Sequence, residues 1–192
     1  MNRKEAILEA AVSLFAERGF SATPTSAVAR TAGVAEGLIF HYFKNKKGIF
    51  IYILQGMLDT YINRIEAIAN RADTGLEAIE DMIHFHFQFS EERSKEFLVV
   101  IRDFPFDLMK PGSHAREMIA DRSAQISALM RECLERGEKD GSIRELSAEK
   151  TVWILRGMLN GISRLKMLGA LPMPELTSEV INFCHQGLAK RN

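Results

Sequence analysis

The residues best suited to chemistry lie near the N-terminus, where hydroxyl, ring and ammonium groups are spaced along short helical segments. Thr25 and Ser26 stand at the start of one segment, where hydroxyl and backbone N–H groups can donate to phosphate oxygens. His41 and Tyr42 carry ring donors on the next segment. Lys46 lies near the start of a longer helical segment, a natural place for a phosphate oxygen. These residue types in this order favour contact with a nucleic acid over catalysis.

A second group of residues could bind metal or form disulfides, but its spacing argues against both. His84 and His86 are two residues apart in a helical segment, so they face different sides and cannot chelate one ion together. Glu80 and His84 share a face, but two ligands are too few for a metal site. Cys133 and Cys184 lie in apolar helical stretches and are expected to be reduced core residues. We therefore expect no metal and no cofactor.

The sequence also lacks the short motifs that mark common enzyme sites. It contains no P-loop, G-x-S-x-G, H-E-x-x-H, C-x-x-C or G-x-G-x-x-G motif. No uncharged apolar run approaches the ~18 residues that a membrane-spanning helix needs. Charged residues from Arg3 onward leave no signal-peptide core. We therefore expect a cytoplasmic protein without enzymatic activity and without a membrane partner.

Apolar residues recur with helical period along nearly the whole chain, which predicts an all-α fold of nine helices. The expected helices cover about residues 3–18, 24–32, 35–43, 47–70, 75–89, 90–103, 114–138, 147–169 and a last segment ending near residue 190. Thr23 is expected to cap the second helix and Ser90 the sixth. Thr74 and Glu77 fit a capping box at the start of the fifth. The three short helices are assigned to an N-terminal helix-turn-helix domain over residues 1–47, and the six mostly longer helices to a second domain over residues 48–192.

The formal charge of the chain is zero, from 25 Lys and Arg against 25 Asp and Glu, which by itself argues against a nucleic-acid partner. The distribution of charge changes this interpretation. Residues 1–47 hold seven Lys or Arg and four Glu, a net charge of +3, so the remainder carries −3. A basic segment of this size is modest, so phosphate attraction alone predicts weak binding with moderate salt sensitivity.

Two short helices joined by a turn that contains Gly33 fit a helix-turn-helix, in which the second helix enters the major groove of DNA. Gly37 near the start of that second helix has no side chain, so the backbone there can approach DNA closely. Short amphipathic helices with glycine turns also occur in helical proteins that do not bind DNA. On the residues alone, both interpretations stand.

A longer pattern of fixed positions resembles the N-terminal signature of the TetR family of bacterial transcriptional regulators. The positions that carry the resemblance are Ile7, Leu14, Phe15, Ala16, Glu17, Arg18, Gly19, Phe20, Ala22, Thr23, Val28, Ala29, Ala32, Gly33, Val34, Gly37, Tyr42, Phe43, Lys44, Asn45 and Lys46. The resemblance implies an all-helical homodimer with an N-terminal helix-turn-helix and a larger C-terminal domain for ligand binding and dimerisation.

Carried over residue by residue, the resemblance implies DNA contacts at Thr25, Ser26, Ala35, Glu36, Gly37, Leu38, Phe40, His41, Tyr42 and Lys46. Three of these depart from the usual family pattern. Ala35 replaces a Ser or Thr and loses a helix cap and a phosphate contact. Glu36 stands where a basic or neutral residue is commoner, and it could accept from cytosine N4 or point away from DNA. Phe40 replaces a frequent Tyr and loses its hydroxyl.

Six of the twelve phenylalanines lie between residues 85 and 106, beginning in a helix that is apolar on two faces. On the residues alone this pattern is typical of a packed core. The resemblance implies a cavity instead, because the family keeps its inducer pocket in this part of the chain. The expected lining residues are Tyr61, Met82, Phe85, Phe89, Phe104, Met118, Arg122 and Trp153.

Arg122 falls on an apolar stripe with Met118 and Ile126, and a guanidinium group that faces inward needs an anion. It could hold the carboxylate or phosphate of a ligand. The alternatives are an internal ion pair with Glu80 or Asp81, or a side chain that extends outward to solvent.

Two glycines indicate a close helix contact near the C-terminus. Gly157 and Gly161 lie one turn apart, and each costs about 1 kcal/mol relative to Ala in a helix. The last helix offers Val180, Ile181, Cys184 and Leu188 on one side. We expect these six residues to form a four-helix bundle with their two-fold mates in a homodimer. Packing within a single chain is the alternative.

The expected function is that of a ligand-responsive DNA-binding regulator, most simply a repressor released from a palindromic operator by a small, largely apolar inducer. In such a dimer the recognition helices lie about 34–36 Å apart, which matches successive major grooves of the operator. The helix over residues 47–70 is expected to link the DNA-binding head to the ligand site. A helical lipid carrier and a DNA binder with a vestigial pocket are the alternatives.

Overall fold

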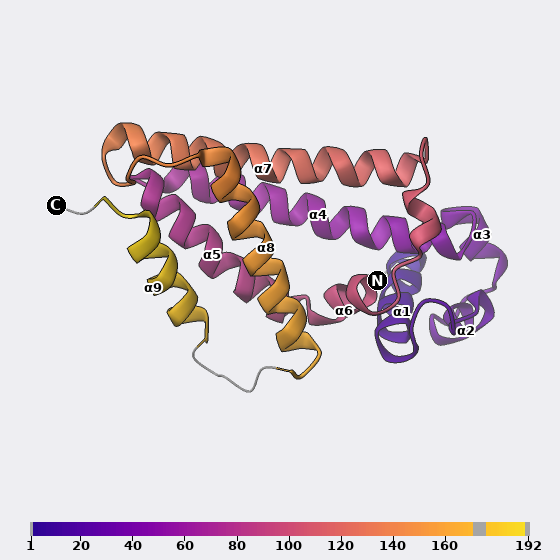
Figure 1. Cartoon of the computed structure of the whole chain (residues 1–192). Helices are drawn as coiled ribbons and strands as arrows, with labels where there is room; N and C mark the ends of the chain where they lie inside the picture. The colour runs from indigo at the N-terminus through magenta and orange to yellow at the C-terminus, as the bar shows by residue number, and fades with distance from the viewer. Residues whose placement is uncertain (1, 171–175, 191–192) are drawn as a thin grey trace. The chain divides into compact units, whose positions relative to one another are not determined.

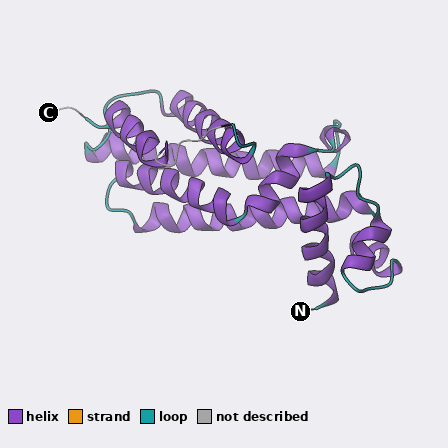
Figure 2. Cartoon of the chain, turned by 90° about the horizontal axis from the view of Figure 1, so that it is seen from below, coloured by secondary structure: helices purple, strands orange, loops and turns teal. Residues whose placement is uncertain are grey.

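A computed structural model describes residues 2–170 and 176–190 of the chain, and it confirms the all-α fold with nine helices. The elements are α1 (Arg3–Arg18), α2 (Thr25–Thr31), α3 (Gly37–Phe43), α4 (Lys46–Arg71), α5 (Gly75–Glu92), α6 (Ser94–Arg102), the 3-10 helix η1 (Phe106–Met109), α7 (His114–Asp140), α8 (Ala148–Met167) and α9 (Leu176–Leu188) (Figure 1). Figure 2 draws no strand in these described residues, where the only strand-like feature is a single bridge between Ile143 and Ala189.

The chain divides into two compact units. Unit 1 consists of Met1–Asp59 and Arg93–Ala120, and unit 2 of Thr60–Glu92 and Asp121–Asn192. Helices α4 and α7 each contribute residues to both units. The predicted domain boundary near residue 47 remains a prediction. The two units are groups of residues that pack together, and α4 runs through position 47 without a break.

Unit 1 is built around α1, which packs against both α2 and α6. Aromatic side chains connect its parts edge to edge. The Phe15 and Phe20 ring centroids are 5.3 Å apart, and those of Phe20 and Phe50 are 5.4 Å apart. Phe50 in turn lies 5.5 Å from Phe104. This core fixes α2 and α3, which are too short to be stable alone.

Unit 2 is centred on α5, which packs against α8 and α9. The two apolar stripes expected on α5 are both buried, including Ile79, Ile83 and Phe87 on one stripe. At its first residue α5 approaches α7 closely, since a Cβ added at Gly75 would lie 2.2 Å from the backbone nitrogen of Gly137. Only glycine fits at that crossing.

The predicted helix caps at Thr23 and Ser90 are wrong. Pro24, and not Thr23, is the N-cap of α2; the buried Thr23 hydroxyl donates to the Gly19 carbonyl at 2.8 Å, at the end of α1. Ser90 is buried within α5, where its hydroxyl donates to Phe87. In both cases the hydroxyl donates to a backbone carbonyl that precedes it in the chain and does not cap the helix that follows.

The capping box at Thr74 is half confirmed. The Glu77 backbone N–H donates to the Thr74 hydroxyl at 3.2 Å, as expected. The Glu77 carboxylate accepts from the Asp73 backbone N–H at 2.8 Å and not from that of Thr74.

Candidate DNA-binding face and ligand site

Helices α2 and α3 in unit 1 form the predicted helix-turn-helix. Ile39 and Phe43 of α3 are buried and anchor the helix in the core. Phe40, His41 and Tyr42 between them are exposed, with 52 % of Phe40 and 39 % of Tyr42 accessible. The apolar side of α3 therefore holds the helix, and its other side offers rings and donors to a partner.

The turns at both ends of α3 depend on glycine. Gly33 precedes it with φ of 65°, a left-handed backbone that favours glycine. After α3, a Cβ at Gly48 would lie 1.8 Å from the Phe43 carbonyl oxygen, so the first turn of α4 requires glycine at this position. The Asn45 side chain accepts from the Gly48 N–H at 3.0 Å and caps α4. These contacts set the direction of α3 relative to the start of α4.

Two predicted DNA contacts are bonded to each other. The Thr25 hydroxyl donates to the Glu36 carboxylate at 2.7 Å, joining the start of α2 to the N-cap of α3. Both side chains have exposed surface, and Ser26, Ala35 and Gly37 beside them are exposed as well. Leu38 is half-buried. The Glu36 carboxylate therefore has a partner within the protein, in line with the alternative that it need not read a base.

The structure gives Lys46 a different role from the predicted phosphate contact. Its ammonium group donates to the Phe20 carbonyl at 2.7 Å and to the Ser21 carbonyl at 3.2 Å. It also lies 4.5 Å from the centroid of the Phe20 ring. Burial lowers the pKa of Lys46, and the charge of Asp103 opposes part of that effect. Lys46 thus ties α4 to the loop after α1, and its neighbour Lys47 pairs with Asp107.

Residues at the end of α6 also bind the end of α1 and the loop that follows it. The sequence did not predict these contacts. The Arg102 guanidinium donates to the carbonyls of Ala16 and Glu17 at 2.9 and 2.8 Å and so satisfies the end of α1. The Asp103 carboxylate accepts from the Ser21 backbone N–H at 2.6 Å. Hydrogen bonding from Ser21 lowers the pKa of Asp103. No spacing pattern could reveal contacts between residues more than 80 positions apart.

A chain of hydrogen-bonded polar side chains, most of them buried, runs through unit 2. The Tyr61 hydroxyl of α4 lies 3.1 Å from Nδ1 of His86 on α5, and the Ser163 hydroxyl of α8 lies 3.1 Å from Nε2. Ser163 then donates to Ser90 at 3.5 Å. His86, Ser163 and Ser90 are each no more than 4 % exposed. Burial lowers the pKa of His86 to about 4, with a hydrogen bond to the Leu159 backbone opposing, so the ring is neutral at pH 7.

Three of the predicted pocket residues, Tyr61, Phe85 and Phe89, pack together at this chain. The centroid of the Tyr61 ring lies 5.3 Å from that of Phe85 and 5.5 Å from that of Phe89. Met82, a fourth predicted pocket residue, is also buried on α5. A buried ring cluster that contains a few hydrogen-bonding groups is typical of sites for apolar ligands.

Of the other predicted pocket residues, two belong to unit 1 and two to unit 2. Phe104 and Met118 belong to unit 1, where Phe104 packs against Phe50. Trp153 is 63 % exposed and so does not line an interior surface. Arg122 is half-buried and already has an interaction of its own.

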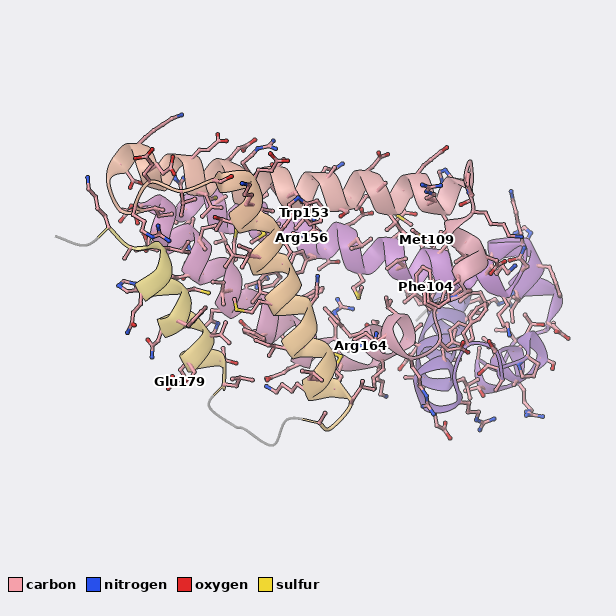
Figure 3. The ribbon with its side chains drawn as sticks, viewed as in Figure 1. Phe104, Met109, Trp153, Arg156, Arg164 and Glu179 are labelled. Atoms are coloured by element: carbon pink, nitrogen blue, oxygen red, sulfur yellow. The ribbon has the colours of Figure 1, made fainter. Side chains whose placement is uncertain are left out.

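Arg156 of α8 is a polar residue of unit 2 that the sequence analysis missed. Its guanidinium donates to the Ser123 carbonyl at 3.0 Å and to the Ser123 hydroxyl at 2.9 Å, and it also donates to the Ser127 hydroxyl. It lies 5.6 Å from the Trp153 ring, and the two are labelled on the first half of α8 in Figure 3. The signal in the sequence was its separation of seven residues from Ser163, which puts both on one face of a helix.

The predicted dimer residues fall on two different faces. Val180, Cys184 and Leu188 are buried within the chain, on the side where α9 packs against α5, so they are not available to another subunit. Ile181 is half-buried, Gly157 is exposed and Gly161 is half-buried. The large apolar side chains of α8, its C-cap and α9 that remain exposed are Trp153, Ile154, Leu165, Leu168 and Phe183.

Unit 1 carries an open groove of about 700 Å³ beside α1. It is lined by residues of α1, the end of α2 and the start of α6, among them Leu8, Val12 and Lys95. The predicted ligand-pocket residues do not line this groove. Among the residues that the structure describes, no helix is long and apolar enough to cross a membrane. The same described ranges contain no cluster of three or more metal-ligating side chains.

Comparison with known proteins gives matches to family descriptions along most of the chain. Residues 7–53 match the family described as "Bacterial regulatory proteins, tetR family". Residues 72–188 match "Tetracyclin repressor-like, C-terminal domain". The second match alone spans more than half of the chain.

Individual relatives agree with this assignment. The HTH-type transcriptional repressor KstR2 of Mycolicibacterium smegmatis is 27% identical over 151 residues, which is 74% of this chain and 68% of that protein. The fatty acid metabolism regulator protein of Bacillus subtilis is 37% identical over 81 residues, 42% of each chain.

Solved structures share the fold over nearly the full length. KstR2 of Mycobacterium tuberculosis has a TM-score of 0.80 at 22% identity and covers 99% of this chain and 96% of its own. FadR of Bacillus subtilis in complex with stearoyl-CoA has a TM-score of 0.80 at 24% identity and covers 95% of this chain and 98% of its own. The chain therefore belongs to the TetR family of bacterial transcriptional regulators.

Proposed function

We propose that the chain is a homodimeric repressor that binds a palindromic operator and is released by a small, largely apolar inducer. The observation that carries the proposal is that one chain holds two separate functional features. One is the exposed face of α3 with His41 and Tyr42, and the other is the buried ring and polar cluster around His86. Binding to DNA would place its action in the cytoplasm.

The proposed DNA contacts follow from the exposed face of α3. Phe40, His41 and Tyr42 would meet base edges and the groove wall, while Ser26 and the Gly37 backbone approach the phosphates. Because the Lys46 ammonium group is bonded to backbone carbonyls, the exposed Lys44 directly after α3 is the better candidate for a phosphate contact.

The proposed dimer face lies on α8 and α9. Large apolar side chains such as Ile154 (67 % exposed) and Phe183 (72 % exposed) are costly in water and are covered when a second copy packs on them. A Cβ added at Gly157 or Gly161 would meet no atom within 4 Å, so packing within one chain does not require these glycines. A close approach of a helix from a second subunit would explain them.

The proposed inducer occupies the region of Tyr61, Phe85 and Phe89 in unit 2. Support comes from the aromatic lining and from the related FadR, which has been solved with the long acyl ligand stearoyl-CoA. Since α4 carries Tyr61 and also begins directly after α3, it is the element through which a ligand would shift the population of DNA-binding conformations.

The experiment that tests DNA recognition is selection of bound duplexes from a random-sequence pool, read by sequencing. The purified chain is expected to enrich an inverted repeat whose half-sites are about 10 base pairs apart or a multiple of that, as a two-fold dimer requires. His41→Ala on α3 should lose this enrichment. His84→Ala, which changes an equally exposed histidine on α5, should keep it.

An enriched sequence without two-fold symmetry would count against the palindromic operator. The absence of any enrichment at low salt would count against DNA binding as a whole.

A further inference from the structure

We infer that Arg156 of α8, together with the Ser123 and Ser127 hydroxyls of α7, forms a binding site for an anionic group at one end of the inducer. The inference rests on the proposed function, since it assumes that a ligand binds in unit 2. It adds the chemical class of that ligand, an apolar chain that ends in a carboxylate or a phosphate.

The guanidinium group is bonded to neutral oxygens. Its partners are the carbonyl and hydroxyl of Ser123 and the hydroxyl of Ser127. Within the described part of the chain no carboxylate pairs with it, and its electrostatic partner is the Tyr61 phenol. The side chain is half-buried, and this burial lowers the pKa of Arg156.

Other arginines of unit 2 are compensated differently. Arg71 lies 3.4 Å from the Asp81 carboxylate, and Arg131 lies 3.9 Å from Glu135, each pair exposed to solvent. Arg136 donates to the Ala69 and Thr74 carbonyls, and it also interacts electrostatically with the Asp140 carboxylate. A half-buried cation without an anion costs free energy, because its desolvation is not repaid by a Coulombic partner. An anionic ligand would supply that partner.

The two serines can take part in binding the anion. They now accept hydrogen bonds from Arg156, and each hydroxyl still has its own hydrogen to donate. A carboxylate or phosphate beside them could therefore accept from the guanidinium and from both hydroxyls. Arginine is well suited to this role, because its planar fork binds such oxygens in pairs.

The position of Arg156 fits a ligand that extends into the aromatic cluster. Arg156 and Ser163 are separated by seven residues on one face of α8, a rise of about 10 Å along the helix. Ser163 belongs to the chain of hydrogen bonds through His86 to Tyr61. That chain is neutral at pH 7, because burial lowers the pKa of His86 to about 4. An anion would therefore be held at the Arg156 end, while the apolar body lies against Phe85 and Phe89.

The test compares three ligands with the same ten-carbon chain: decanoate, decanoyl-CoA and 1-decanol. Binding to the full-length chain is measured by the fluorescence of Trp153, the one tryptophan, whose ring lies 5.6 Å from the Arg156 guanidinium. The wild-type chain should bind at least one anion more tightly than decanol, and the identity of that anion separates a carboxylate site from a phosphate site. Arg156→Gln should weaken the binding of that anion about tenfold or more, which is the scale of a charge-assisted hydrogen bond. The affinity for decanol should stay unchanged.

Two further variants separate ligand binding from a structural role. Arg164→Gln changes an exposed arginine further along α8 and should leave the affinities for all three ligands unchanged (Figure 3). Ser127→Ala removes one bond between α7 and α8 while keeping the charge, so the preference for the anion should persist. If Arg156→Gln and Ser127→Ala both lower stability and neither changes the order of affinities, Arg156 is only a clamp between the helices.

The possible failures are distinguishable from failure of the proposed function. Equal affinity of the wild-type chain for all three ligands would overturn the anion site and leave an apolar inducer standing. Binding of none of them would also overturn the anion site. Enrichment of an operator by the same preparation reports on DNA recognition independently of any ligand.

Discussion

At the scale of single residues, the ammonium group of Lys46 has different binding partners from those predicted. Position and charge favoured a phosphate contact, but the ammonium group donates to the Phe20 and Ser21 carbonyls. A lysine side chain is long enough to reach either partner, and the sequence does not say where the loop after α1 passes. The tether, together with Arg102, holds the end of α1 and the loop that follows it.

The tether predicts separable effects of two neighbouring lysines. Lys46→Ala should lower the free energy of unfolding in urea by about 1–2 kcal/mol, because two hydrogen bonds from a charged donor are lost. In Lys46→Ala the dependence of the operator affinity on salt concentration should be the same as in the wild type. Lys44→Ala should do the reverse, keeping stability and lowering the slope of log Kd against log salt by about one. A reduced slope in Lys46→Ala alone would restore the original assignment.

His86 predicts a specific dependence of stability on pH. Its pKa is 6.5 in the unfolded chain and about 4 in the folded protein, because burial disfavours the charged ring. Below pH 6.5 the unfolded state therefore binds more protons, and stability falls as the pH is lowered towards 4, by on the order of 3 kcal/mol in total. His86→Gln should be less stable overall but should flatten this dependence between pH 6.5 and 4.

The control for that measurement is His84→Gln on the same helix. It replaces an exposed histidine and should keep the wild-type slope. Parallel slopes for wild type and His86→Gln would contradict a neutral buried ring at position 86.

At the scale of elements, the helices themselves were predictable from the sequence and their ends less so. Periodic apolar residues define α5 and α7 because burial of a stripe is what stabilises a helix in a protein. The caps at Thr23 and Ser90 were assigned to the wrong helix, because a hydroxyl near a junction can serve the helix on either side. The polar chain from Tyr61 through His86 to Ser163 joins three helices. The spacing of residues within one helical segment cannot predict which residues of other helices they contact.

The crossing of α5 and α7 predicts a steric effect at Gly75. A Cβ there would lie 2.3 Å from the Cys133 carbonyl oxygen and 2.2 Å from the Gly137 nitrogen, both of them backbone atoms that cannot move aside alone. Gly75→Ala should therefore destabilise the chain by about 2 kcal/mol or more in urea denaturation. Gly187→Ala in α9, where a Cβ meets no atom within 4 Å, should not destabilise it. Equal stability of the two variants would contradict the close crossing.

At the scale of the whole molecule, the sequence predicted that α8 and α9 carry the dimer interface but misjudged the face of α9. Val180 and Cys184 lie on an apolar stripe, and a stripe looks the same whether its partner belongs to the same chain or to another. Only the packing of α9 on α5 shows that this stripe is already covered. The neutral total charge was equally uninformative, since a basic N-terminal segment and an acidic remainder cancel.

The revised face predicts the effect of polar substitutions on mass in solution. Phe183→Ser should shift the chain from dimer to monomer in light scattering, because a large exposed anchor is lost. Phe106→Ser removes a side chain that is 81 % exposed on η1 and should leave the dimer intact. Gly161→Leu should also yield monomers, since it fills the space that a second helix would need. A dimer that survives both changes in α8 and α9 would move the interface elsewhere.

The central claim, that a ligand controls DNA binding by this chain, is tested most directly by fluorescence anisotropy of a labelled operator duplex obtained by selection. The operator Kd is measured with and without saturating decanoyl-CoA, decanoate and 1-decanol in turn. At least one of them is expected to raise the operator Kd about fivefold or more, the usual range of coupling between two sites. An operator Kd that none of the three changes, while Trp153 fluorescence reports that a ligand is bound, would contradict it.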